Sequence, residues 1–310
     1  MPVIIPNNLP ARTTLNDENI FTMEEGRAST QDIRPLQIVV VNLMPTKVAT
    51  ETQLARVLSN TPLQIELTLV CMDSHESKNV SQTHLAEFYK TWEEIKDKKF
   101  DGMILTGAPV ELLDFEEVDY WEELKLILAW AKENVYSTMH ICWGAQAALY
   151  YKYGIKKHQT AQKVFGVFEQ KVMAPHNPLM RGFDEYFYAP HSRHTYVETE
   201  DIQKHKALRI MAQSEEAGVH IASTENGREI YVLGHQEYDK ETLELEYKRD
   251  LERGLDIDPP KNYYKNNDPQ SDILYRWRGH ASLLFSNWLN YYVYQNTLYD
   301  ISGGFQNVIE

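Results

Sequence analysis

Apolar runs of strand length alternate with helical patterns through the first half of the chain. Residues 36–43 form an almost unbroken β-branched run, which is typical of a parallel strand buried on both faces. Residues 118–134 carry apolar side chains at helical spacing and predict an amphipathic helix. Similar patterns predict strands, with the turns that end them, over residues 63–71, 101–109 and 136–141, and a helix over residues 50–59. This alternation predicts an α/β fold, with an open, mostly parallel sheet flanked by helices and ligands beyond the carboxyl ends of the strands.

The second half of the chain consists of shorter β-rich runs. They lie between residues 159 and 233, and polar loops such as residues 190–194 divide them. No flexible or charged linker separates the two halves, so we expect these strands to form the far half of the same sheet rather than a subdomain. Residues 1–35 are punctuated by proline and show little periodicity. They predict an extended N-terminal arm, followed by a single domain over residues 36–310.

Charge and cysteine content exclude several function classes. The 310 residues carry a net charge of -14, whereas nucleic-acid and anionic-membrane binders need clustered Lys and Arg, so we expect neither partner. The only cysteines are Cys71 and Cys142, which argues against a disulfide framework and a Cys-based zinc site and indicates a reducing compartment. No stretch reaches the ~18 consecutive apolar residues of a membrane span, and we recognise no signal segment. We therefore expect a cytoplasmic protein.

A candidate nucleophile stands where the strand over residues 136–141 ends. Cys142 follows this strand, and four of the next six residues are glycine or alanine, as a close strand-to-helix turn requires. Such a nucleophile elbow projects its side chain from the carboxyl end of a strand, next to helix amides that can hold an anion. A buried structural cysteine is the alternative. Lys47 and Gly107 also fall at predicted strand ends, so three turns point to one edge of the sheet and favour the elbow.

A nucleophilic cysteine needs a base within hydrogen-bond reach and a third group that orients this base. The chain has 11 histidines, so residue type alone selects none of them. Residues 230–238 predict a strand that ends in His235 and Glu237, and the period of two places both side chains on one side of the backbone. Glu237 can then hold His235 in the tautomer that faces the thiol; a partly exposed pair at a strand end is the alternative. The loop at residues 190–194 lacks the ligand spacing of a zinc site, and we expect no metal.

Five short segments carry a family resemblance that covers nearly the whole chain. They are residues 42–47 (NLMPTK), 105–111 (LTGAPVE), 140–146 (HICWGAQ), 189–193 (APHSR) and 234–238 (GHQEY). In this order they resemble the homoserine O-acyltransferases of methionine biosynthesis, a family built on the class I glutamine amidotransferase-like fold. Five segments in the right order are a far more specific signal than any one of them.

The resemblance implies a catalytic triad of Cys142, His235 and Glu237. Cys142 is then the nucleophile that takes an acyl group from acyl-coenzyme A as a thioester. His235 is the general base, first for the thiol and later for the substrate hydroxyl, and Glu237 orients it. The resemblance also implies that the amide of Trp143 and the side chain of Lys47 stabilise the tetrahedral oxyanion.

The resemblance further implies the substrates. Lys163, Ser192 and Arg249 fall on the family's homoserine-contacting positions, where a guanidinium suits a carboxylate. The partners are then acyl-coenzyme A and L-homoserine, which react in a two-step, ping-pong sequence without a further cofactor. The family is typically homodimeric.

The donor depends on the residue that follows the 107–110 turn. In this family, glycine there leaves room for the extra carboxylate of succinate, whereas glutamate fills the space. The chain has Glu111, which should crowd and repel a succinyl tail, so we expect a homoserine O-acetyltransferase that uses acetyl-coenzyme A. The alternatives are a homoserine O-succinyltransferase, a glutamine amidotransferase with a partner synthetase, and a non-catalytic binding protein of the same fold.

Overall fold

The computed structural model describes residues 3–6, 8–18, 20, 22–23, 34–75 and 80–297. The strands are β1 (Val3–Ile4), β2 (Thr22–Met23), β3 (Leu36–Val41), β4 (Ile65–Val70), β5 (Tyr89–Lys90), β6 (Phe100–Leu105), β7 (Val135–Ile141), β8 (His158–Val172), β9 (Tyr186–Tyr196), β10 (Leu208–Ser214), β11 (Gly218–Thr224) and β12 (Glu229–Val232). The α-helices are α1 (Pro10–Asp17), α3 (Lys47–Leu58), α4 (Gln82–Phe88), α5 (Trp92–Ile95), α6 (Trp121–Asn134), α7 (Trp143–Tyr153), α8 (Thr199–Gln203), α9 (Thr242–Glu252) and α10 (Arg278–Asn287). Shorter or wider helical turns are η1 (Phe115–Glu117), η2 (Pro178–Met180), η3 (Lys265–Asn267) and the π-helix η4 (Trp288–Tyr294), which continues α10.

One sheet organises the described part of the chain. It has 12 strands in the order β2-β1-β4-β3-β6-β7-β12-β11-β10-β8-β9, with β5 paired to β4. Every pairing from β2 to β12 is parallel, and every pairing from β12 to β9 is antiparallel. The expected open sheet flanked by helices is therefore confirmed, and the β-rich second half extends the same sheet.

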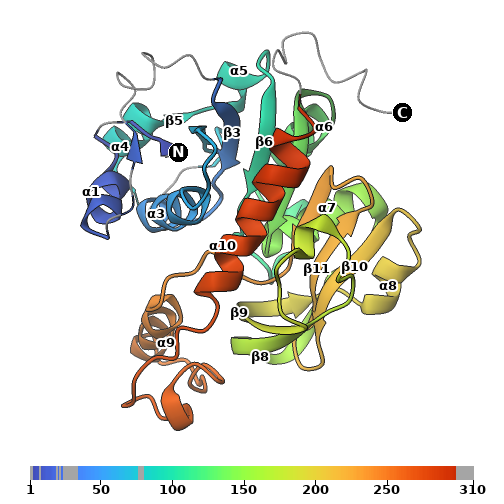
Figure 1. The fold of residues 1–310 in the computed structure, drawn as a ribbon. Coiled ribbons are helices and arrows are strands. Elements are labelled where there is room, and N and C mark those ends of the chain that lie inside the picture. The colour runs from blue at the N-terminus through green and yellow to red at the C-terminus, as the bar shows by residue number, and fades with distance from the viewer. Residues whose placement is uncertain are drawn as a thin grey trace.

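Strand β3 shows why the strands in the parallel half of the sheet have continuous apolar sequences. Ile38 and Val40 pack against side chains of α3 and α10 on one face, and Val39 and Val41 pack against α6 and α7 on the other. Figure 1 shows α10 crossing the face that it covers. A strand buried on both faces has no polar side, which removes the alternation seen in half-exposed strands.

The expected polar loop at residues 190–194 is wrong. These residues lie inside β9, where Pro190 pairs with Val167 and Ser192 pairs with Phe165 of β8. β9 is the last strand of the sheet, and an edge strand tolerates a proline because the missing N–H would face away from its neighbour. Because residues 190–194 belong to a strand, their side chains point alternately to the two faces of the sheet.

The expected extended arm is wrong for part of residues 1–35. Residues 10–17 form helix α1, with Pro10 as its first residue. Proline lacks a backbone N–H, and this costs nothing there because an N–H in the first turn has no acceptor within the helix. Strands β1 and β2 join the sheet beside β4. Residues 1–2, 7, 19, 21 and 24–33 lie outside the described residues, and the division into an arm and one domain stays a prediction.

Within the described ranges, no helix is both long and apolar enough to cross a membrane. No group of three or more His, Cys, Asp or Glu side chains in these ranges is arranged to hold a metal ion.

Candidate active site

Cys142 occupies the predicted elbow between β7 and α7. Its backbone has φ 50° and ψ -116°, a conformation that is uncommon for a residue with a side chain. The Cys142 N–H donates to the carbonyl of Val232 on β12 at 2.7 Å, and its own carbonyl accepts the first helical hydrogen bonds of α7. Such strain persists only where the surroundings impose it, and it is typical of a nucleophile elbow.

Two glycines make the close approach around Cys142 possible. A Cβ atom at Gly144 would lie 2.5 Å from the carbonyl oxygen of Thr106, so α7 packs directly on the end of β6. A Cβ atom at Gly107 would lie 3.2 Å from Cys142 Cβ and 3.5 Å from His235 Cε1. Gly107 therefore lies against both the nucleophile and the candidate base, as the shared sheet edge predicted.

His235 and Glu237 follow the end of β12, the neighbour of β7. The Nδ1 atom of His235 lies 2.7 Å from Oε1 of Glu237, and the His235 N–H donates to the carbonyl of Pro190 at 2.8 Å. All three side chains are nearly closed to solvent, with 7% of Cys142, 4% of His235 and 7% of Glu237 exposed. The geometry leaves Nε2 of His235 for the thiol, because Glu237 occupies Nδ1.

The surroundings of His235 favour its protonated form. Burial alone would lower the pKa of this imidazole, but the negative charges of Cys142 and Glu237 and the hydrogen bonds to both raise it well above its ordinary value. The ring also stacks on Tyr238, with centroids 4.1 Å apart. His235 is thus held in place from three sides and is able to carry the proton of the thiol.

Of the two expected oxyanion-stabilising groups, Trp143 directly follows Cys142. It is the first residue of α7, where a backbone N–H has no acceptor within the helix. Lys47 opens α3 at the same sheet edge, but its ammonium group donates to the carbonyls of Asn42 at 2.7 Å and Met44 at 3.4 Å. None of the contacts described for Lys47 is with Cys142 or His235.

The three residues on the homoserine-contacting positions come together around one face of α9. Lys163 on β8 donates to Oδ2 of Asp250 at 3.1 Å, and Arg249 contacts the same carboxylate through Oδ1. Ser192 on β9 donates to Oε2 of Glu246 at 2.5 Å. Figure 1 shows α9 beside the ends of β8 and β9, which explains how residues distant in sequence converge.

Glu246 connects this cluster to the triad. Its Oε1 atom accepts a hydrogen bond from the hydroxyl of Tyr238 at 3.0 Å, and Tyr238 stacks on His235. Lys163 lies 3.7 Å from the same carboxylate. The acidic and basic side chains therefore form one ion-paired cluster, which the ring of Tyr238 connects to His235.

Glu111 lies beside β9, where it contacts the backbone of His194. Its carboxylate accepts the N–H of His194 at 3.3 Å, and its carbonyl accepts from Lys157 at 2.6 Å. The neighbouring Arg193 is 2% exposed and donates to the carbonyls of Thr195 and Ala217. Burial lowers the pKa of Arg193 to about 10, although the negative charges of Cys142 and Glu111 oppose this shift.

Sequence reasoning missed Arg193, Tyr238 and Glu246. Arg193 and Tyr238 lie within segments that carried the resemblance, so a search there for buried polar side chains could have found them. Glu246 had no such signal, because a glutamate in a charged amphipathic helix ordinarily faces solvent.

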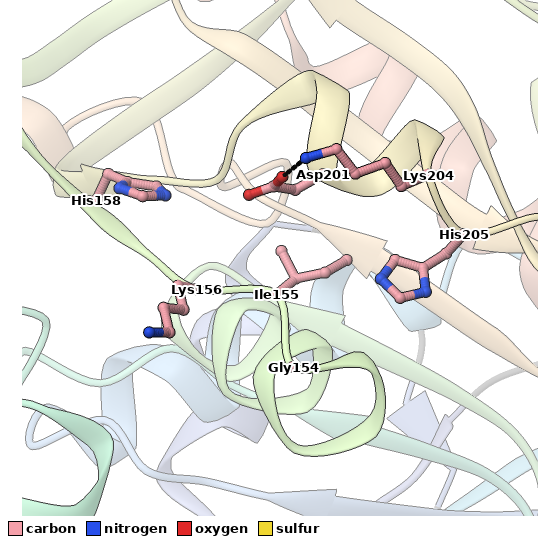
Figure 2. A pocket seen from close by; sticks show the side chains of 7 residues that line it. All are labelled: Gly154, Ile155, Lys156, His158, Asp201, Lys204 and His205. Atoms are coloured by element: carbon pink, nitrogen blue, oxygen red, sulfur yellow. Dashed lines mark hydrogen bonds and ion pairs between the residues drawn. The ribbon is translucent and has the colours of Figure 1, made fainter.

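A separate hollow of about 220 Å³ lies at the other end of α7, away from Cys142. Gly154, Lys156 and His158 line it, and Figure 2 shows Asp201 paired with Lys204 on the side formed by α8. A helix of 11 residues separates it from the elbow, so it does not belong to the candidate active site.

Solved structures show the fold. A glutamine amidotransferase from Thermotoga maritima aligns with a TM-score of 0.56 at 12% identity and covers 83% of this chain and 98% of that chain. A glutamine amidotransferase from Methylobacillus flagellatus aligns with a TM-score of 0.51 at 9% identity and covers 83% of this chain and 95% of that chain. The expected class I glutamine amidotransferase-like fold is therefore confirmed.

Sequence relatives show the family. The chain is 59% identical over 301 residues to a homoserine O-acetyltransferase from Clostridium acetobutylicum, which spans 97% of this chain and 100% of that protein. It is 60% identical over 299 residues to a homoserine O-acetyltransferase from Bacillus mycoides, across 96% of this chain and 99% of that protein. A family model described as homoserine O-succinyltransferase matches residues 2–299. The chain therefore belongs to the homoserine O-succinyltransferase family.

Proposed function

We propose that this protein is a homoserine O-acetyltransferase of methionine biosynthesis, which transfers the acetyl group of acetyl-coenzyme A to the side-chain hydroxyl of L-homoserine. The observation that carries the proposal is the buried Cys142–His235–Glu237 arrangement at a strained elbow. It occurs in a chain whose relatives at 59% and 60% identity are named homoserine O-acetyltransferase.

In the first half-reaction, His235 takes the thiol proton of Cys142, and the sulfur attacks the thioester carbonyl of acetyl-coenzyme A. The N–H of Trp143 donates a hydrogen bond to the oxyanion that forms, and the ammonium group of Lys47 supplies a positive charge from the same sheet edge. The carbon–sulfur bond to coenzyme A then breaks, and its thiolate leaves with the proton from His235. An acetyl-cysteine thioester remains on the enzyme.

In the second half-reaction, homoserine occupies the space beside α9. Arg249 suits its carboxylate, whereas the Glu246 carboxylate suits its ammonium group, with Ser192 and Lys163 as further polar contacts. His235 takes the proton of the homoserine hydroxyl while the oxygen attacks the acetyl-cysteine. The carbon–sulfur bond breaks, Cys142 recovers the proton, and O-acetylhomoserine leaves.

The enzyme uses no cofactor besides the co-substrate acetyl-coenzyme A, works in the cytoplasm as a homodimer, and binds neither nucleic acid nor membranes. The net charge of -14 supports the last point, because phosphate-rich partners require basic surfaces.

Intact mass after mixing with each acyl donor alone tests the nucleophile and the donor together. We expect one acetyl adduct on the wild type with acetyl-coenzyme A, little succinyl adduct, and no adduct on Cys142→Ser. The matched control is Cys71→Ser, which removes the chain's other cysteine and should acylate as the wild type does. Full coenzyme A release by both Cys142→Ser and Cys142→Ala would rule out the covalent mechanism. Ammonia release from glutamine, without acyl transfer, would instead support the amidotransferase alternative.

A further inference from the structure

A buried chain of hydrogen bonds lies under the loop that joins β3 to α3. Its centre is Glu51 on α3, which is 3% exposed although it is a carboxylate. The Oε1 atom of Glu51 accepts from the hydroxyl of Tyr89 at 2.6 Å and lies 2.9 Å from Nε2 of His84. Burying a carboxylate is costly unless it is hydrogen-bonded, so these contacts must persist for Glu51 to stay inside.

The chain of hydrogen bonds continues from Tyr89 to the loop. The side-chain amide of Asn42 donates to the Tyr89 hydroxyl at 2.8 Å, and Oδ1 of Asn42 accepts the N–H of Met44 at 3.1 Å. The carbonyl of the same Asn42 accepts the ammonium group of Lys47 at 2.7 Å. Asn42 thus holds the backbone of the loop and the Lys47 side chain at once.

The loop is also tied to the turn beside the nucleophile. The N–H of Leu43 donates to the hydroxyl of Thr106 at 2.7 Å. Thr106 precedes Gly107, where an added Cβ atom would meet Cys142 and His235. A shift of Asn42 would therefore reach both Lys47 and the Gly107 turn.

Charge links Glu51 to Lys47 as well. Burial lowers the pKa of the Lys47 ammonium group, and the negative charge of Glu51 opposes this shift. Burial also raises the pKa of the nearby Cys71 thiol, so this thiol is neutral at neutral pH and Glu51 supplies the charge beside Lys47. Glu51 follows Lys47 by four residues on α3, so the two side chains lie on the same helix face. Removing the charge of Glu51 would leave the buried ammonium group easier to deprotonate.

We propose that Glu51 and Tyr89 are positioning residues for acyl transfer, which hold Asn42 and, through it, the Lys47 ammonium group at the active-site edge of the sheet. Neither residue touches the reacting atoms; they act through Lys47. The inference rests on the proposed function, in which Lys47 stabilises the oxyanion.

The test compares Glu51→Gln and Tyr89→Phe with the wild type in coenzyme A release from acetyl-coenzyme A with homoserine. We expect each variant to lower kcat by roughly 10- to 100-fold, because small displacements of stabilising groups are costly, with little change in either KM. In Glu51→Gln, the alkaline limb of the pH–rate profile should move to lower pH. In a Lys47→Met background, neither change should lower kcat further, since the group that they position is gone.

The matched control is Tyr292→Phe. Tyr292 lies in the same apolar cluster as Tyr89, and its hydroxyl donates to Oδ1 of Asn177 at 2.8 Å. This variant should lose comparable stability in thermal unfolding and keep the wild-type kcat. Should Glu51→Gln fail to fold, Tyr89→Phe, which removes a single oxygen atom, decides the test alone.

Two results would overturn the inference while the proposed function stands: a wild-type kcat and pH profile in Tyr89→Phe, or losses that add fully to that of Lys47→Met. A wild type that releases no coenzyme A would overturn the proposed function and this inference together.

Discussion

The carboxylate of Glu111 and the guanidinium of Arg193 both lie at strand β9, and in the proposed function they affect which acyl group the enzyme accepts. Glu111 accepts the N–H of His194, and its charge acts on the buried Arg193. We expect a glutamate there to occupy space and to offset part of the charge of Arg193. Without Glu111, we expect the positive charge of Arg193 to attract a succinyl carboxylate more strongly.

We therefore expect Glu111→Gly to change the choice of donor. The ratio of kcat/KM for succinyl- over acetyl-coenzyme A should rise by at least about tenfold, or about 1.4 kcal/mol, because the variant removes both crowding and repulsion. Steady-state kinetics with both donors measures this ratio. Glu111→Gln is the matched control, since it keeps the size and removes only the charge. An unchanged ratio in both variants would remove Glu111 from the specificity argument.

Helix α7 and strand β6 meet more closely than side chains normally permit. A Cβ atom at Gly144 would lie 2.5 Å from a backbone oxygen, which cannot move without displacing β6. We expect Gly144→Ala to lower the free energy of unfolding by about 1–3 kcal/mol and to reduce kcat, since it pushes the Trp143 N–H away from the oxyanion. Thermal unfolding and coenzyme A release measure the two effects.

Gly279→Ala is the control for this prediction. Gly279 lies in α10, and a Cβ atom there would have no heavy atom within 4 Å. Alanine should stabilise this helix by about 0.4–1 kcal/mol and leave kcat unchanged. Equal activity in Gly144→Ala and the wild type would contradict the close approach of α7 to the site.

At the level of elements, the sequence predicted those parts of the fold that local pattern determines. The strand over residues 136–141 and its elbow are present. A short apolar run followed by small residues forms few structures other than a buried strand with a close turn into a helix. The middle of strand β9, residues 190–194, escaped prediction, because a proline and alternating polar side chains resemble a loop until the edge position is known. Helix α1 was missed because its 8 residues show too little apolar periodicity.

The residues of the candidate site also fall into those that local sequence pattern predicts and those that it does not. Cys142, His235 and Glu237 were predictable because strand ends in a parallel sheet meet at one edge. Glu246 and Arg193 depend on how β9 and α9 pack in three dimensions, which no local pattern encodes. The candidate site is therefore composite: the parallel half of the sheet positions Cys142 and His235, whereas the antiparallel half and α9 position Lys163, Ser192 and Glu246.

Across the whole molecule, several buried titratable groups give stability a dependence on pH. His220 is fully buried, and burial, together with the positive charges of Arg193 and His235, lowers its pKa to about 3. The pKa of the adjacent His191 is also well below its ordinary value, chiefly because of burial. In the unfolded chain both imidazoles take up protons below about pH 6.5, whereas in the fold they stay neutral, so stability falls as pH decreases.

Other buried groups also make the free energy of unfolding depend on pH, and some of them act in the opposite direction. Burial raises the pKa of Asp239 from 3.8 to about 6, so its folded form binds the extra proton and gains stability as pH falls. Despite burial, the hydrogen bond to His140 and the charge of Lys152 lower the pKa of Glu229 from 4.5 to about 2, and its contribution is lost only below about pH 4.5. His235 is already protonated in the fold below pH 6.5, so its contribution is fully present there.

Comparing the wild type with His220→Gln isolates the contribution of His220 to the pH dependence of stability from the contributions of the other buried groups. Between pH 6.5 and 4.5, the wild type should lose about 2 kcal/mol more unfolding free energy than His220→Gln, because the variant has no imidazole to protonate on unfolding. Urea unfolding at several pH values measures the difference, and the contributions of Asp239, Glu229 and His235 cancel between the two proteins. Parallel stability curves would mean that His220 takes up a proton inside the fold, next to Arg193, which its closed surroundings should forbid.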